Sequence, residues 1–268
     1  MSQEGNEFTV RPVGFVRSGV VDRKAMPLWG ATAAVEILPE FADALLKIEK
    51  HSHLWIFGWL GQGRDERHVL QVIPRGYLDR SPSGLHGVFA VRSPARPNPI
   101  GLTAARVIAI EGLTIRLDRL DFMDGTPVLD IKPYLATRDL IFSANYGQLG
   151  QARTREDLRD SLMTQAVQFH GQRKGDLALA VRIIEHYRAT RFELSDPGLY
   201  PVTAPLDRPI LLDGLMGITR STPGRGTLRF GASSSVQVGA VTYRLIAGDT
   251  SDPEAVLRAD ESSLFDAS

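Results

Sequence analysis

The first half of the sequence consists of short segments in which apolar and polar residues alternate, and this pattern restricts the fold more than any other feature. Alternation over four to eight residues indicates strands with one buried face. Such segments occupy residues 8–18, 33–37, 53–60, 68–73, 87–91, 102–110 and 113–120. One amphipathic helix is expected at residues 40–50, after Pro39. Because closure removes exposed strand edges, these elements predict a mainly β domain, a closed or nearly closed antiparallel barrel, over residues 1–147.

The second half has a different pattern, which begins after glycine and charge increase at residues 145–156. Helical spacing appears in residues 155–169, 175–189 and 208–219, and strands are expected within residues 226–231 and 233–248. These elements predict a small α+β C-terminal domain over residues 155–250. The remaining residues, 251–268, are mostly polar, and we expect this tail to fray.

Composition narrows the classes of function. The 268 residues are 43% apolar and 23% charged, as in soluble globular proteins, and 31 basic residues balance 31 acidic ones. No net charge therefore draws the whole molecule onto nucleic acid. The absence of cysteine excludes disulfides, thiolate zinc sites and thiol nucleophiles. With neither a leader-like start nor a long apolar run, a cytoplasmic protein with no membrane association is expected.

The segment RSPARPNPIG, residues 92–101, contains three prolines and two arginines between two expected strands. Proline fixes φ, so Arg92 and Arg96 would stand on a stiff loop, a suitable arrangement for a carboxylate, a phosphate or a planar base. Residues 71–110 contain five arginines and one acid, so this region is locally positive. The alternative is a braced surface turn with two solvated arginines.

Other polar groups allow weaker hypotheses. Asp118, Asp121, Asp124 and Asp130 fall within thirteen residues, but their spacing fits no known calcium loop, so an oxygen-ligand metal site is the poorer interpretation. The turn Asp124-Gly-Thr-Pro is able to direct a carboxylate into a cavity or simply to close a hairpin. His51 and His53 share an expected strand face with Trp55, without a third metal ligand. No glycine pattern of a phosphate loop and no nucleophile signature is present.

Three blocks, SHLWIF (52–57), GVFAVRSPARPNPIGLT (87–103) and LDFMDGTPVLDIKPY (120–134), resemble in order those of the TrmO/TsaA-like (YaeB-like) tRNA methyltransferase family, over about residues 8–147. The resemblance implies a small β-barrel that binds S-adenosylmethionine, usually as a homodimer. It also implies, for some members, methylation of the exocyclic amine of threonylcarbamoyl-adenosine beside the tRNA anticodon.

The resemblance also assigns residues. The implied cofactor contacts are Pro27, Leu28, Trp29, His53, Leu54, Arg92, Leu102, Leu120, Asp121, Phe122 and Met123. Trp29 and Asp121 suit a sulfonium cation, and Arg92 suits the amino-acid carboxylate. The residues expected to orient the acceptor amine are Asp124, Asn98 and Tyr134, with Arg96 and Lys132 on substrate phosphates.

In the second half, residues 169–183 and 211–230 resemble a degenerate FmdE-like domain, which would span residues 155–247. His170 matches that pattern, but Gln172 and Lys174 stand where it has a histidine and a cysteine, so no metal is expected. The competing possibility is a rebuilt site in which His170 recruits Asp176 or His186. Two alternatives to a tRNA methyltransferase stay open: a non-enzymatic S-adenosylmethionine sensor, and a methyltransferase for a small molecule recognised by this domain.

Overall fold

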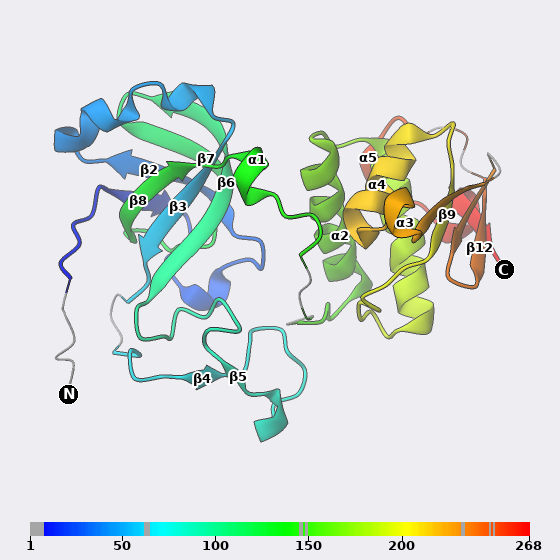
Figure 1. The fold of residues 1–268 in the computed structure, drawn as a ribbon, viewed down its shortest axis with the longest axis horizontal. Coiled ribbons are helices and arrows are strands. Elements are labelled where there is room, and N and C mark those ends of the chain that lie inside the picture. Colours follow the sequence, from blue (N-terminus) through cyan, green and yellow to red (C-terminus); the bar gives the residue numbers. More distant parts are fainter. Residues whose placement is uncertain are drawn as a thin grey trace. The chain divides into compact units, whose positions relative to one another are not determined.

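The structure, a computed structural model, describes residues 8–61, 65–144, 147, 150–231, 234–246, 248 and 250–268, and it contains two compact units (Figure 1). The first comprises residues 1–74 and 80–141, and the second comprises residues 75–79 and 142–268. Residues 145–146 and 148–149, in the stretch at which we expected the second domain to begin, lie outside the described residues. So do residues 1–7, in which we expected no leader.

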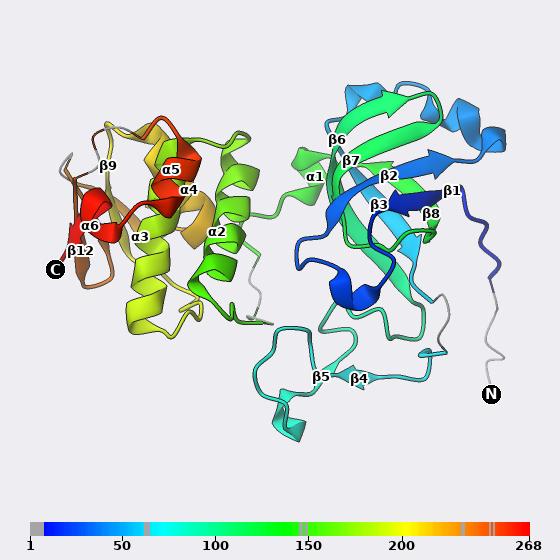
Figure 2. The same ribbon diagram turned by 180° about the vertical axis from the view of Figure 1, so that it is seen from behind.

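The first unit is a closed six-stranded barrel (Figures 1 and 2). Its strands are β1 (Gly14–Ser18), β2 (Ala31–Ile37), β3 (His53–Trp59), β6 (Ile100–Glu111), β7 (Thr114–Leu120) and β8 (Pro127–Pro133). They follow the order β1-β2-β7-β6-β3-β8, every neighbouring pair is antiparallel, and β8 pairs back onto β1. The predicted closed antiparallel barrel is therefore confirmed.

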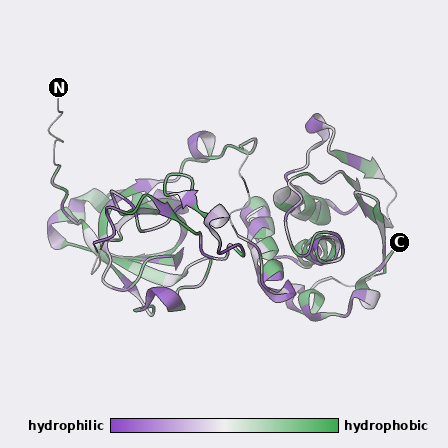
Figure 3. Cartoon of the chain, turned by 90° about the horizontal axis from the view of Figure 1, so that it is seen from below, coloured by the Kyte–Doolittle hydropathy of each residue, from purple (hydrophilic) through white to green (hydrophobic). Residues whose placement is uncertain are grey.

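Alternation along the strands fills the barrel with apolar side chains. In β3, Leu54 and Ile56 are buried inside, whereas Trp55 and Phe57, which alternate with them, stand on the outer face. Buried and more exposed residues also alternate along β1 and β2, and Figure 3 shows hydrophobic (green) and hydrophilic (purple) residues in both units. The rest of the barrel core consists of the buried side chains of Val16, Ala33, Val35, Ile37, Ala105, Ile115, Leu117, Leu120, Phe122 and Val128.

Two expectations for the first unit are wrong. Residues 40–50 form two short 3-10 helices, η2 (Pro39–Leu45) and η3 (Ile48–Lys50), because the chain breaks at Lys47, whose φ is 69°. The strands expected at residues 68–73 and 87–91 shrink to a separate two-residue pair, β4 (Gln71–Val72) with β5 (His86–Gly87). After β5 the chain turns at once, since the N–H of Ala90 donates to the carbonyl of Gly87.

The remaining short elements of the first unit are η1 (Arg23–Ala25), η4 (Pro82–Gly84) and α1 (Ala136–Asp139).

The second unit is an α+β domain. Its long helices are α2 (Arg155–His170), α3 (Gly175–Arg191) and α4 (Pro209–Thr219), with a short η5 (Pro223–Arg225). Its sheet has the order β10 (Leu228–Gly231), β9 (Val202–Pro205), β11 (Ser235–Val238), β12 (Val241–Leu245) and β13 (Phe265–Ala267). Helix α3 packs against α2, α4 and α5 (Pro253–Arg258), which explains why most of its residues are buried, including the charged Arg182, Glu185 and Arg188. No helix in the described part of the chain is long and apolar enough to cross a membrane.

The C-terminal tail is folded, and the expectation that it frays is wrong. It forms α5 (Pro253–Arg258), α6 (Glu261–Leu264) and strand β13, which pairs with β12. Asp252 accepts a hydrogen bond from the N–H of Glu254 at 2.8 Å and so caps α5. Two apolar pairs, Val256 with Leu257 and Leu264 with Phe265, anchor the tail in the core. Because the tail is mostly polar, its composition did not indicate that these two apolar pairs would be buried.

Candidate cofactor site on the barrel

Two of the predicted cofactor segments meet through Gly30. This residue has a φ of 81°, and a Cβ built on it would lie 2.6 Å from the backbone carbonyl of Leu120. Only glycine fits such a position. The turn that carries Pro27, Leu28 and Trp29 is therefore pressed against the backbone of Leu120 and Asp121, at the point where β2 and β7 pair.

The segment that follows β7 also reaches β6. The ring of Phe122 lies against Gly58 and Gly101, where an added Cβ would come within 2.8 Å and 2.6 Å of it. The hydroxyl of Thr103 donates to the carboxylate of Asp121. Leu102, which lies between Gly101 and Thr103, is thus held beside residues 120–123. The structure brings these predicted contacts together on one side of the barrel.

His53 lies further along the same side. It is opposite Arg106 in the β3–β6 pair, four residues along β6 from Leu102, or about 13 Å at strand spacing. Burial lowers its pKa; the carboxylate of Asp118 opposes this effect, and Arg106 and Arg119 reinforce it. His53 is therefore a neutral imidazole at pH 7, and its Nδ1 lies 2.9 Å from the hydroxyl of Ser52.

Arg119 provides a link between His53 and Trp29. Its guanidinium carbon lies 5.8 Å from the centroid of the Trp29 ring, and its charge acts on the His53 imidazole. The Trp29 side chain is still 39% exposed, so part of the ring stays available to a second cation. Sequence reasoning did not identify Arg119, Thr103 or Gly30, because each matters through a strand neighbour that only the barrel register defines.

Three of the predicted contacts have buried side chains. The side chains of Leu54, Leu120 and Phe122 are at most 1% exposed and belong to the barrel interior. Any contact that they make with a ligand must involve their N–H or C=O groups. Backbone groups of this kind are suited to reading the edge of an adenine ring.

The two arginines of the proline loop play different parts. Arg92 is exposed. Arg96 turns inward, where it donates to the carbonyls of Val88 and Val91, the second at 2.7 Å. The expectation that Arg96 points towards a substrate phosphate therefore disagrees with its geometry. The reason is that prolines supply no N–H, so this loop has carbonyls in need of a donor.

This arrangement makes a prediction about the loop. Arg92→Ala should weaken S-adenosylmethionine binding by about tenfold, the effect of losing one charge-assisted hydrogen bond, without altering the thermal midpoint. Arg96→Ala should instead make residues 88–97 more sensitive to proteolysis. Calorimetry and limited proteolysis on both variants measure the two effects. Unchanged proteolysis of Arg96→Ala would contradict the bracing role.

The three residues expected to orient the acceptor do not form one group. Asp124 and Tyr134 flank opposite ends of β8, about 20 Å apart at strand spacing, so they cannot act on one atom. The Asp124 carboxylate accepts from the N–H of Ser18 at 3.0 Å, which makes the Asp-Gly-Thr-Pro turn structural. Asn98 is exposed beside β6, and its carbonyl accepts from Ile100. Tyr134 lies beside His53, with the two ring centroids 6.2 Å apart, whereas Asp124 directly follows the predicted contact Met123 in the sequence.

The last predicted substrate residue, Lys132, lies on the outer face of β8. Its Nζ is 2.5 Å from Asp130 and 5.9 Å from the centroid of the Phe57 ring. Its side chain is 59% exposed, so it is available to an external partner.

The side chains considered for a metal have separate partners. Asp118 accepts from the N–H of Arg106, and Asp121, Asp124 and Asp130 contact the groups described above. Within the described ranges no three His, Asp or Glu side chains form a group that could hold a metal ion. In the second unit His170 contacts Asp213 at 2.9 Å, a pair that sequence spacing did not reveal. The rebuilt site is wrong, because Asp176 is bound by Arg208 and Thr250, and His186 faces Tyr243.

Comparison with known proteins agrees with the barrel. Residues 16–140 match the tRNA-methyltransferase O N-terminal domain. A probable S-adenosyl-L-methionine-binding protein of Methanothermobacter thermautotrophicus is 42% identical over 132 residues, which are 48% of this chain and 90% of that protein. One of the same description from Archaeoglobus fulgidus is 39% identical over 178 residues, 65% of this chain and 46% of the relative. The chain thus spans less than half the length of that relative.

A protein of Mus musculus named tRNA (adenine(37)-N6)-methyltransferase is 42% identical over 96 residues, which are 36% of this chain and 21% of that protein. The fold and these matches place the chain among β-barrel proteins whose relatives are named as S-adenosyl-L-methionine-binding proteins. The chain belongs to the family of the tRNA-methyltransferase O N-terminal domain. The TrmO/TsaA-like resemblance is thereby confirmed, and the FmdE-like resemblance of the second half stays a prediction.

Proposed function

We propose that this protein is an S-adenosylmethionine-dependent methyltransferase that acts on tRNA, at the exocyclic amine of threonylcarbamoyl-adenosine beside the anticodon. The observation that carries the proposal is the convergence of Trp29, Leu102 and Asp121 through Gly30 and Thr103, in a chain whose family includes named tRNA methyltransferases. A cytoplasmic location and a homodimer are part of the same proposal.

The side chains present suit this cofactor. A sulfonium cation is stabilised by an aromatic face and a carboxylate, which Trp29 and Asp121 supply, and Thr103 holds that carboxylate in one orientation. Exposed Arg92 suits the amino-acid carboxylate, and the backbone of residues 120–123 suits the adenine. When bound, S-adenosylmethionine supplies an electrophilic methyl group on positively charged sulfur.

The residues of this chain then have to position an amine and accept its hydrogen bond. His53 is neutral and has an imidazole nitrogen available for that task, and Tyr134 stands beside it. Methyl transfer to that amine would release one proton, which the neutral imidazole of His53 would accept. Alignment contributes most of the acceleration, because the methyl donor is intrinsically reactive.

A second candidate is a cofactor-binding protein without methyltransferase activity. It is favoured by the names of the two archaeal relatives, which describe binding only. Both candidates require the same barrel site, so a binding measurement alone does not separate them.

The expected result is methyl transfer. Purified protein should bind S-adenosylmethionine in calorimetry, and the ligand should raise the thermal midpoint by linkage. With tRNA that carries threonylcarbamoyl-adenosine, mass spectrometry of the nucleosides should show a gain of one methyl group. The matched control is tRNA that lacks the threonylcarbamoyl group. Binding without transfer would support the second candidate, and absence of binding at millimolar ligand would overturn both.

A further inference from the structure

The second unit contains a cavity lined by arginines that the proposed methyl transfer does not use. It has a volume of about 360 Å³ and lies where the C-terminal segment packs against α2 and α3. Its lining is Arg155, Arg159, Arg182, Arg258, Ala259, Asp260 and Glu261.

One carboxylate organises three of these arginines. Glu185 is completely buried, and its oxygens accept from Arg155 at 2.7 Å, Arg159 at 2.9 Å and Arg182 at 3.2 Å. Arg155 also pairs with Glu261 at the rim of the cavity. Four arginines, of which Arg258 stands exposed at the opening, therefore face three carboxylates, those of Glu185, Asp260 and Glu261.

The arginines also have more donors than acceptors. Three guanidinium groups carry about fifteen N–H donors. Arg155, Arg159 and Arg182 make eight hydrogen bonds within the described residues. Arg182 is only 5% exposed, and its buried Nε has no partner in the described part of the chain. Burial lowers the pKa of Arg182; Glu185 opposes this effect, and the charge of Arg159 adds to it. Positive charge is therefore in excess, a condition that an anion relieves.

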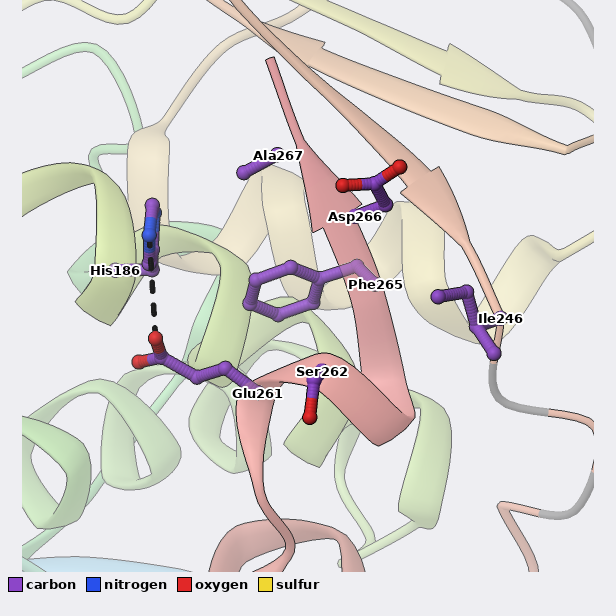
Figure 4. A pocket seen from close by; sticks show the side chains of 7 residues that line it. All are labelled: His186, Ile246, Glu261, Ser262, Phe265, Asp266 and Ala267. Atoms are coloured by element: carbon purple, nitrogen blue, oxygen red, sulfur yellow. Dashed lines mark ion pairs between the residues drawn. The ribbon is translucent and has the colours of Figure 1, made fainter.

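A second cavity adjoins the first, and Glu261 lines both (Figure 4). It has a volume of about 380 Å³. Figure 4 shows the polar groups of His186, Glu261, Ser262 and Asp266 around the ring of Phe265. Carboxylate and hydroxyl oxygens beside an apolar face suit a ring that bears several hydroxyl groups. Asp266 already accepts from Arg244, which leaves part of its acceptor capacity free.

We propose that the second unit binds a small phosphorylated sugar, with the phosphate among the arginines and the hydroxylated ring in the adjoining cavity. The guanidinium fork is the side chain best matched to phosphate oxygens. A nucleic-acid backbone is a poorer fit, since Asp260 and Glu261 at the rim would repel the neighbouring phosphates of a strand. This site lies outside the barrel and is independent of the proposed methyl transfer.

The test is calorimetry on the full chain with four probes, of which the first three are inorganic phosphate, ribose 5-phosphate and ribose. Ribose 5-phosphate should bind more tightly than inorganic phosphate, and ribose alone should not bind measurably. Saturating S-adenosylmethionine should leave these results unchanged, because the nucleoside site of the barrel is separate. An anticodon stem-loop RNA serves as the fourth probe.

Two variants locate the binding. Arg258→Ala removes an exposed guanidinium outside the Glu185 network and should weaken ribose 5-phosphate about tenfold, with an unchanged thermal midpoint. Arg229→Ala, an exposed arginine on β10, is the control and should bind like the parent. Equal affinity in Arg258→Ala and the parent, or no phosphate-dependent binding at millimolar concentration, would overturn the proposal. It would also fail if Arg258→Ala affected only the RNA, since the cavity would then be a nucleic-acid site.

Discussion

Replacing Glu185 by alanine is expected to destabilise the second unit by about 3–5 kcal/mol, the cost of leaving buried charges without their partner. Its carboxylate is completely buried and holds guanidinium groups from α2 and α3. Two of these arginines, Arg159 and Arg182, also bind the carbonyl of Leu257, so the network fastens the C-terminal segment. Differential scanning calorimetry should show the transition of this unit at a much lower temperature, or no transition at all.

The matched control is Glu254→Ala. This glutamate also pairs with an arginine, Arg173, but its side chain is 48% exposed. Exposed pairs contribute about 0–1 kcal/mol, so the thermal midpoint should hardly move. If the two variants lost similar amounts of stability, the buried network of Glu185 and three arginines would contribute no more than an exposed ion pair. The barrel should keep its S-adenosylmethionine affinity in both variants, because its hydrophobic core is separate.

The second large effect is expected at Gly30. Gly30→Ala should weaken S-adenosylmethionine binding by about tenfold or more, because a Cβ 2.6 Å from the Leu120 carbonyl must push the Trp29 turn away. The measurement is a calorimetric titration, together with a circular dichroism spectrum to show that the barrel persists.

The control variant Gly112→Ala distinguishes the effect of backbone strain at a positive φ from the effect of displacing the Trp29 turn. Gly112 has a φ of 61°, close to the value at Gly30, but a Cβ there meets nothing within 4 Å. Both variants therefore carry the backbone cost of about 1 kcal/mol, and only Gly30→Ala moves the turn. If Gly30→Ala binds S-adenosylmethionine as tightly as the parent protein does, the turn is not part of the cofactor site.

The period-two pattern was sufficient to predict the barrel, because strands that alternate through a closed interior leave a clear record in the sequence. Segments 68–73 and 87–91 were predicted as full strands because their local apolar content resembles a strand, although they pair with each other over only two residues and do not join the barrel. For the C-terminal tail the sequence pattern failed to indicate a folded segment. Four buried apolar residues were enough to anchor this mostly polar segment of eighteen residues.

The candidate site was predictable only in part. The family resemblance indicated Trp29, His53, Arg92 and Asp121. The contacts of Asp121 with Thr103 and of Trp29 with Arg119, however, depend on strand register. Arg96 looked like a ligand residue because sequence shows a charge but not the carbonyls that it satisfies. Long-range pairing of this kind leaves no local signal.

A barrel whose hydrogen-bonding ladder is complete offers no backbone template to a second copy, so the homodimer that the family resemblance implies would not form by pairing of barrel strands. Association has to depend on outward side chains, such as Trp55, Phe57 and Trp59 on β3. Contacts of that type change with single substitutions, whereas the ladder does not. Quaternary structure is therefore expected to diverge among relatives faster than the barrel, and an assembly seen in one member is a poor guide to another.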